Sequence, residues 1–112
     1  MQSPEFPPFV RSLPEADLPI EGVRGWLLRS DVGLVLFLEA TEEVDLPLHT
    51  HGDQWGIVVD GSMELTIGDE TRTCRRGDSY VIPSGTPHGA LLHAGLRLVD
   101  FFTDPDRYHP RA

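Results

Sequence analysis

Three histidines and one glutamine in this chain have the types and spacing of a metal-ion site. The chain contains His49-Thr50-His51, then Gln54, and later His88, which follows the turn sequence Pro83-Ser84-Gly85-Thr86-Pro87. Residues i and i+2 of a β-strand point to the same face, so a strand through His49 and His51 places two imidazoles side by side. Such a pair binds a single cation, each ring through one nitrogen. The turn predicts a new strand that begins at His88 and adds a third imidazole.

Short strands are the elements that must position these side chains. The turn signals Asp60-Gly61 and Gly68-Asp69 separate apolar runs, and no stretch holds a helical period for three turns. We expect strands over residues 25–30, 33–40, 54–59, 62–67, 71–75, 79–82, 88–93 and 96–102. Short, evenly spaced strands predict an all-β sandwich or barrel. Residues 1–21 are proline-rich and predict an N-terminal arm, and residues 22–112 predict a single barrel domain.

The phase of two strands matters for the site. If Gln54 points inward, Gly56 shares its face and leaves open volume beneath the site, while Trp55, Ile57 and Val59 form an apolar strip on the outside. Such strips pack on another sheet, an arm or a second subunit. In the last strand, Asp100 shares a face with Leu96, Leu98 and Phe102. An inward phase buries these apolar side chains and brings one carboxylate into the interior.

The bulk properties exclude several classes of function. The chain has 112 residues and a formal charge of -9, which argues against nucleic acid or an anionic membrane as a partner. Cys74 is the only cysteine, which favours a reducing compartment, and there is no signal segment or apolar run of membrane-spanning length. We therefore expect a cytoplasmic protein.

The histidine and glycine pattern resembles the cupin superfamily. The second cupin motif, Gly-x5-Pro-x-Gly-x2-His, is met in full by Gly77, Pro83, Gly85 and His88. The first motif is met in its second half by His49-x-His51, Gln54 and Gly61. Three departures stand out: residue 43 is glutamate in place of the leading glycine, the spacing from the second histidine to the fourth ligand is one residue short, and that ligand is Gln54 in place of glutamate.

The resemblance implies a fold and a cofactor. The fold is a double-stranded β-helix, a jelly-roll-like barrel, and the cofactor is one divalent transition metal per chain (zinc, nickel, iron or manganese). The implied ligands are His49, His51, Gln54 and His88, although Gln54 can equally hydrogen-bond a metal-bound water. A neutral glutamine leaves the site with about one more positive charge than glutamate does, which predicts weaker binding but a stronger Lewis acid.

The chain also resembles the small cupins that open unsaturated uronates, through Gln54 and the later Asp100-x-Phe102 and Arg107. We assign Asp100 and Arg107 to catalysis and Phe102, Gly56 and Tyr80 to the substrate pocket. Two alternatives stay open, since Asp100 can be a structural acid and Arg107 a surface residue. Tyr80, like Trp26 and Trp55, can also be a core or interface aromatic.

These expectations favour a metal-dependent enzyme that acts on a small oxygenated acid or sugar acid by isomerisation, ring opening or a lyase-type proton transfer. Two other functions remain open: a non-catalytic module that binds or senses a small metabolite, and a non-haem iron dioxygenase. We also expect a homodimer, formed through the strip at Trp55 or by exchange of the N-terminal arm.

Overall fold

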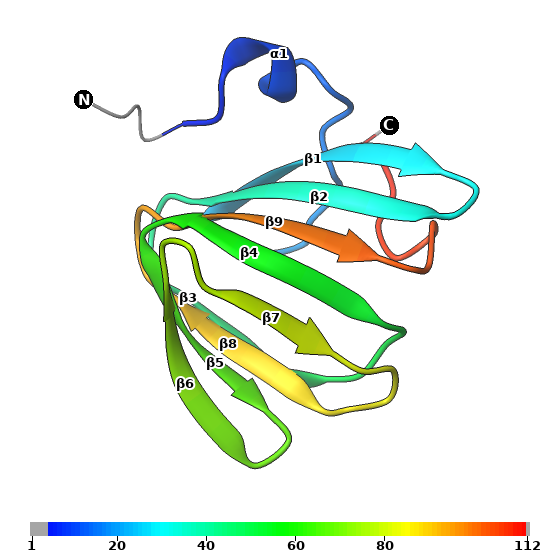
Figure 1. The fold of residues 1–112 in the computed structure, drawn as a ribbon. Coiled ribbons are helices and arrows are strands. Elements are labelled where there is room, and N and C mark those ends of the chain that lie inside the picture. Colours follow the sequence, from blue (N-terminus) through cyan, green and yellow to red (C-terminus); the bar gives the residue numbers. More distant parts are fainter. Residues whose placement is uncertain (1–4, 112) are drawn as a thin grey trace.

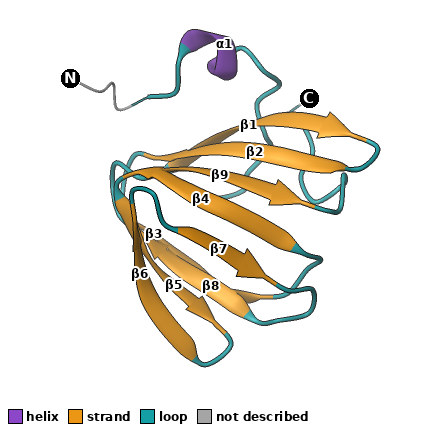
Figure 2. Cartoon of the chain, in the orientation of Figure 1, coloured by secondary structure: helices purple, strands orange, loops and turns teal. Residues whose placement is uncertain are grey.

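Nine strands form two antiparallel sheets packed face to face, and they account for nearly all regular structure in residues 5–111, the part of the chain that the computed structural model describes (Figures 1 and 2). The five-stranded sheet has the order β1-β2-β9-β4-β7 and the four-stranded sheet the order β3-β8-β5-β6. The strands are β1 (Val23–Ser30), β2 (Gly33–Ala40), β3 (Val44–His49), β4 (Gln54–Asp60), β5 (Ser62–Ile67), β6 (Glu70–Arg75), β7 (Ser79–Ile82), β8 (His88–Leu92) and β9 (Arg97–Phe102). The predicted all-β class is confirmed.

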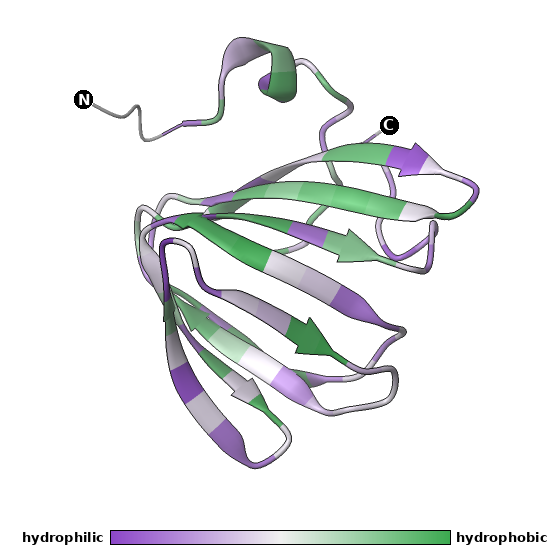
Figure 3. Ribbon diagram, in the orientation of Figure 1, coloured by the Kyte–Doolittle hydropathy of each residue, from purple (hydrophilic) through white to green (hydrophobic). Residues whose placement is uncertain are grey.

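The space between the sheets is filled by the inward residues of each strand. Leu34, Leu96 and Val58 have at most 1% of their surface exposed and lie at the centre of this core. β2 is apolar along most of its length, whereas β6 carries mostly hydrophilic residues (Figure 3). β2 lies inside its sheet between β1 and β9, while β6 is an edge strand. The hydropathy of each strand therefore follows its place in the sheet.

The inward phase predicted for β4 and β9 is correct. Gln54 and Asp100 are buried, with 9% and 6% of their surface exposed, whereas Trp55, on the opposite face of β4, is 44% exposed. The predicted open volume beside Gly56 is wrong, because the Tyr80 hydroxyl and the Asp100 carboxylate occupy the place that a side chain at Gly56 would take. Gly56 is thus needed for close approach of these two groups.

The segment before β1 lies against its own barrel. Ala16 N donates to Gly25 O at 2.8 Å and Leu27 N donates to Pro14 O at 2.9 Å, which extends the β1 edge. The C-terminal tail pairs with the same segment, since Asp17 N donates to His109 O at 2.8 Å. The segment therefore runs between β1 and the tail of its own chain.

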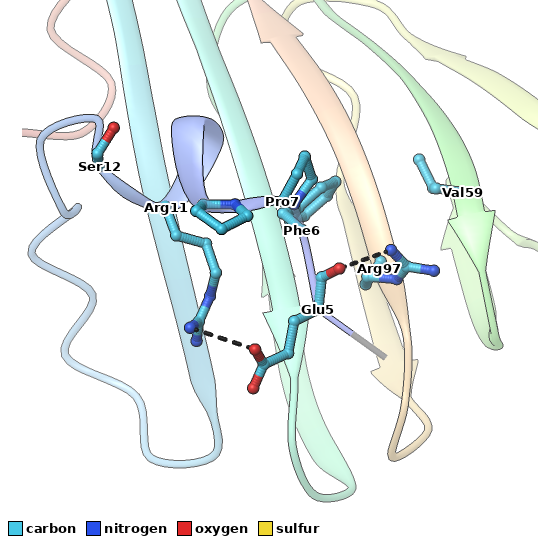
Figure 4. A pocket seen from close by; sticks show the side chains of 8 residues that line it. Glu5, Phe6, Pro7, Arg11, Ser12, Val59 and Arg97 are labelled. Atoms are coloured by element: carbon cyan, nitrogen blue, oxygen red, sulfur yellow. Dashed lines mark hydrogen bonds and ion pairs between the residues drawn. The ribbon is translucent and has the colours of Figure 1, made fainter. Parts of the chain in front are cut away.

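The short helix α1 (Pro8–Arg11) and residues 5–7 before it cover one end of the outer face of the five-stranded sheet. Phe6 is buried edge-to-face against Phe37, with ring centroids 5.6 Å apart. Figure 4 shows the hollow between this segment and the sheet, where Arg97 donates to Glu5 O at 3.1 Å and Arg11 pairs with the Glu5 carboxylate at 3.4 Å. Among the described residues, no helix is both long and apolar enough to cross a membrane.

Candidate metal centre

Three different elements bring the histidines together. His49 is the last residue of β3, His88 is the first residue of β8, and the two are register partners. His51 lies in the loop between β3 and β4, so the expectation that His49 and His51 share one strand is wrong. The three imidazoles nevertheless offer ligand atoms that all lie within 4.8 Å of one another.

Hydrogen bonds between two loops place His51 opposite His88. Gly85 N donates to His51 O at 3.0 Å, and Ser84 N donates to the Asp53 carboxylate at 2.7 Å. Gly85 has φ of +79°, a left-handed conformation that glycine adopts without strain. The turn before β8 thus fixes two histidines at once, one through its own strand and one through the loop that it binds.

A bulge in β3 directs His49 toward the other two rings. Leu46 pairs with Ala90 and His49 pairs with His88, so β3 has one more residue than β8 over this stretch. Pro47 lies in the bulge, where its missing N–H costs no ladder hydrogen bond. Gly89 faces the bulge, and a side chain there would lie 2.6 Å from Leu46 O. Glycine at position 89 therefore permits the bulge.

The hydrogen bonds of the rings leave one nitrogen of each free for a cation. The Nδ1 atoms of His49, His51 and His88 lie 2.9, 2.8 and 2.9 Å from the carbonyl oxygens of Pro47, Gly52 and Thr86. A carbonyl only accepts, so each Nδ1 carries the proton and each neutral ring presents the lone pair of its Nε2.

The buried ring of His88 and the partly buried ring of His51 bring these lone pairs unusually close. His51 Nε2 and His88 Nε2 are 2.9 Å apart, which is favourable only with a proton or a cation between them. Burial lowers the pKa of His51 to about 4 and also lowers that of His88, so neither ring readily binds the bridging proton near neutral pH. The donor set therefore fits a divalent transition metal.

Gln54 lies in the same cavity and is held by Asp100. The Gln54 side chain hydrogen-bonds the Asp100 carboxylate, which accepts when ionised. The amide nitrogen must then face Asp100, and Oε1 is left for another partner. Gln54 is thus positioned to offer a neutral oxygen beside the histidines.

Asp100 is the buried carboxylate of the site. The Tyr80 hydroxyl donates a hydrogen bond to Asp100 Oδ1 at 2.6 Å. Burial raises the pKa of Asp100 to about 6, although the hydrogen bonds from Tyr80 and Gln54 oppose this change. Burial also raises the pKa of Tyr80 well above its ordinary value, so the phenol stays protonated and donates. Asp100 therefore changes its charge close to neutral pH.

The cavity that these residues share is small. Its volume is about 70 Å³, room for about two water molecules. The Phe102 ring closes one side, 5.5 Å from the His51 ring and edge-on to it. Of the residues predicted for the pocket, Phe102 and Tyr80 line the cavity, and Gly56 lies behind Tyr80 and Asp100.

Arg107 lies at the mouth of the site. Its guanidinium stacks on the Tyr108 ring at 4.4 Å and lies 5.9 Å from the Phe102 ring. The charge of Arg107 contributes to the low pKa of His51, which places the two groups in one electrostatic environment. Sequence reasoning missed Tyr108, which lines the cavity, although an aromatic residue directly after Arg107 was a usable signal.

Comparisons with known proteins identify the family of this chain. Residues 34–102 match the sequence model of a family described as the cupin domain. Quercetin 2,3-dioxygenase of Bacillus subtilis (strain 168) is 34% identical over 74 residues, a match that covers 63% of this chain but only 22% of the relative. The activity of that longer protein therefore does not transfer by the match alone.

Two solved structures show the same fold. An RmlC-like cupin from Shewanella frigidimarina NCIMB 400 has a TM-score of 0.74 and 23% identity, over 84% of this chain and 86% of that one. KdgF from Halomonas sp. has a TM-score of 0.70 and 24% identity, over 87% and 86%. The predicted double-stranded β-helix is confirmed by these likenesses.

Proposed function

The chain belongs to the cupin domain family, and from this membership we propose that it is a metal-dependent enzyme acting on a small oxygenated acid. The observation that carries the proposal is the convergence of three Nε2 lone pairs beside a buried carboxylate, Asp100, in one cavity. Imidazole nitrogens supply the metal site, and the carboxylate supplies a group that can take up a proton.

The proposed cofactor is one divalent ion, zinc, nickel, iron or manganese, held by His49, His51 and His88 with Gln54 as the fourth ligand. When bound, such an ion polarises a ligand carbonyl or carboxylate oxygen and acidifies the neighbouring C–H group. The neutral Gln54 adds no negative charge to the site, so the ion keeps more of its Lewis acidity than it would beside a glutamate.

Four side chains of the chain have proposed roles beside the ion. Asp100 is the proposed base, since with a pKa of about 6 it is mostly ionised at neutral pH and still basic enough to accept a proton. Tyr80 holds Oδ1 of Asp100 in place and stabilises the ionised form. Arg107 binds the substrate carboxylate at the mouth, and Phe102 excludes water from one side.

The proposed reaction is an isomerisation, ring opening or lyase-type proton transfer. Unsaturated uronates are the first candidates because Gln54, Asp100, Phe102 and Arg107 together resemble the pattern of the uronate-opening cupins. A second candidate reaction, dioxygenation, is favoured by the 34% identity to a quercetin 2,3-dioxygenase. A binding module without catalysis is the third, and the small cavity of about 70 Å³ supports it.

We also propose a homodimer, formed through the outer face of the five-stranded sheet. Strand register aligns one apolar side chain from each of its five strands into a row across this face: Leu28, Val35, Phe101, Trp55 and Val81. Leu28, Trp55 and Val81 are 55%, 44% and 64% exposed. In the adjacent row, Trp26 is buried with the guanidinium groups of Arg11 and Arg24 over its ring, and Phe37 contacts Phe6, so the exposed part of this face is the row through Trp55. Exposed apolar faces of this extent mark protein interfaces.

Metal analysis and a matched pair of variants test the enzymatic proposal. Metal-loaded wild type should turn over an unsaturated uronate or another keto or hydroxy acid, followed by absorbance or NMR. Asp100→Asn should lower turnover by about 10²- to 10⁴-fold with metal content unchanged. Full activity in Asp100→Asn would end the catalytic role of this residue, and oxygen consumption on turnover would shift the assignment to dioxygenation.

The pH profile separates a base from a merely structural carboxylate. Activity should rise with pH through about 6, because only ionised Asp100 accepts a proton. The Tyr80 hydrogen bond lowers the pKa of Asp100, so Tyr80→Phe should move this rise to higher pH. A profile that does not move in Tyr80→Phe would contradict the assignment.

A further inference from the structure

A second and wider hollow lies beside the histidine cavity. Its volume is about 510 Å³, within the range of small-molecule sites, whereas the histidine cavity measures about 70 Å³. The two share His49, Leu46 and Tyr108 among their linings. We call this hollow the arm groove, because residues 17–20 of the N-terminal segment form one wall and residues 107–109 of the tail form another.

The walls of the arm groove are mainly apolar. Leu18, Pro19 and Ile20 line it from the N-terminal segment, and Leu46 and Pro47 line it from β3. Ile20 is 39% exposed even though it is a large aliphatic residue. An apolar ligand body would therefore remove further aliphatic surface from water on binding.

Arg107 supplies the one guanidinium of the groove lining, and it is free for an anion. Five other arginines form ion pairs with carboxylates: Arg11, Arg24, Arg29, Arg97 and Arg111. Within residues 5–111, Arg72, Arg75, Arg76 and Arg107 make no such pair, and of these four only Arg107 lines the arm groove and has a buried Nε without a hydrogen-bond partner. Asp17 on the opposite wall disfavours a second anionic group.

From these walls and this unpaired cation we infer that the ligand is a monocarboxylate with an apolar body, which lies in the arm groove while its acid end reaches Arg107 and the histidines. The inference rests on the metal site proposed above for the acid end and narrows the proposed class of small oxygenated acids to those with an apolar body, which places the unsaturated uronates behind them as candidates. A sugar acid fits the walls poorly, because its hydroxyl groups would face aliphatic side chains and lose their hydrogen bonds to water. The N-terminal segment thereby becomes the element that determines specificity.

A series of 2-oxo acids of increasing length tests the inference. Pyruvate, 2-oxobutanoate, 2-oxopentanoate, 2-oxohexanoate and phenylpyruvate are titrated calorimetrically into metal-loaded and into metal-free protein, with galacturonate as the sugar acid. Affinity should rise by about fourfold for each added methylene that enters the groove. Phenylpyruvate should bind more tightly than galacturonate.

Two matched variants locate the effect. Ile20→Gln removes apolar wall without adding charge and should weaken phenylpyruvate binding by about threefold or more, with pyruvate binding unchanged. Val32→Gln makes the same kind of change at the β1–β2 turn, outside the groove lining, and should change nothing. Arg107→Gln should weaken all the acids alike.

The outcomes distinguish this inference from the proposed function. Affinity that is flat along the series, tighter binding of galacturonate, or equal behaviour of the Ile20 and Val32 variants would overturn the inference. Protein that carries no metal but still binds longer acids more tightly would support the arm groove and refute the metal centre. Protein that carries metal but whose affinity for the acids does not depend on their chain length would support the metal centre and refute the arm groove.

Discussion

The two faces of the five-stranded sheet divide the chemistry of this protein between them. On the inner face, β4 and β9 present Gln54, Asp100 and Phe102 to the histidine cavity. On the outer face, the same two strands present Trp55 and Phe101, which stand directly opposite each other in the ladder. Successive residues of one strand thus serve a polar site and an apolar surface.

This division shows how much depends on register. Side chains alternate with a period of two, so a slip of one residue would move Gln54 and Asp100 to the outside and Trp55 into the core. The two faces should also be separable by mutation. Changes on the inner face should affect metal and chemistry and leave assembly intact, and changes on the outer face should do the opposite.

Loss of metal is the largest effect expected from the inner side. His51→Ala should abolish stoichiometric metal binding after dialysis, measured by mass spectrometry of the metal, because it removes one of three converging imidazoles. Gln54→Glu should strengthen binding by adding a negative ligand. The dimer mass should stay unchanged in both variants.

His93→Ala is the matched control, because His93 lies outside the cavity lining and contacts Glu43 and Glu64 on the surface. It should keep its metal. If a variant that lacks all of His49, His51 and His88 still binds one ion per chain, the proposed centre is wrong.

On the outer face, the largest expected effect is the loss of dimerisation in Trp55→Glu. A charge within the apolar row should weaken dimerisation by about 30-fold or more, since tryptophan positions in interfaces commonly contribute about 2 kcal/mol. Analytical ultracentrifugation measures the dissociation constant, and metal content should be unchanged. Val32→Glu adds the same charge at the exposed β1–β2 turn and should leave the dimer intact. A monomeric wild type would refute the proposed interface.

Gly56→Ala tests how tightly the inner face is packed. A Cβ there would overlap Asp100 Oδ1 and the Tyr80 hydroxyl, so the variant should lose about 1–3 kcal/mol of unfolding free energy. Gly52→Ala is the control, because its Cβ would meet only Thr103 Oγ1, at 3.6 Å. Chemical denaturation should show a much lower free energy of unfolding for Gly56→Ala than for Gly52→Ala. Equal values would mean that Tyr80 and Asp100 can move aside at little cost.

Much of the fold and of the site was predictable where a period of two applies. Alternation in β4 and β9 indicated that Gln54 and Asp100 point inward, and the turn before His88 indicated the start of β8. These features depend on local sequence alone. The resemblance to the cupins then supplied the arrangement of strands, which alternation cannot.

The rest depends on contacts between distant segments. The extent of β3 was not predicted: a strand was expected only at His49 and His51, because Pro47 and the bulge interrupt the alternation before them. The placement of His51 depends on hydrogen bonds to the loop at Ser84 and Gly85, more than 30 residues away. The filling of the space at Gly56 depends on Tyr80 from β7. None of these contacts leaves a periodic signal in the sequence.

The smallest expected effect contrasts the histidines of the cavity with a surface histidine. Burial lowers the pKa of His51 and His88, whereas hydrogen bonds to Glu64 and then Glu43 raise that of His93. His93 Nε2 lies 2.5 Å from Glu64 and Nδ1 lies 3.3 Å from Glu43. The protonated ring, which directly follows β8, therefore links Glu64 of β5 to Glu43 directly before β3.

The direction of the pH effect follows from this raised pKa. A group with a higher pKa in the folded state stabilises fully below its unfolded value, about 6.5, and loses that contribution as pH rises through the folded value. His93→Gln should therefore lower the melting temperature at about pH 6, and its difference from wild type should shrink toward about pH 8.5. High salt should shrink the difference further, since the pair is exposed. A difference that grows with pH would mean that His93 acts as a neutral ring, and the contrast with the histidines of the cavity would be lost.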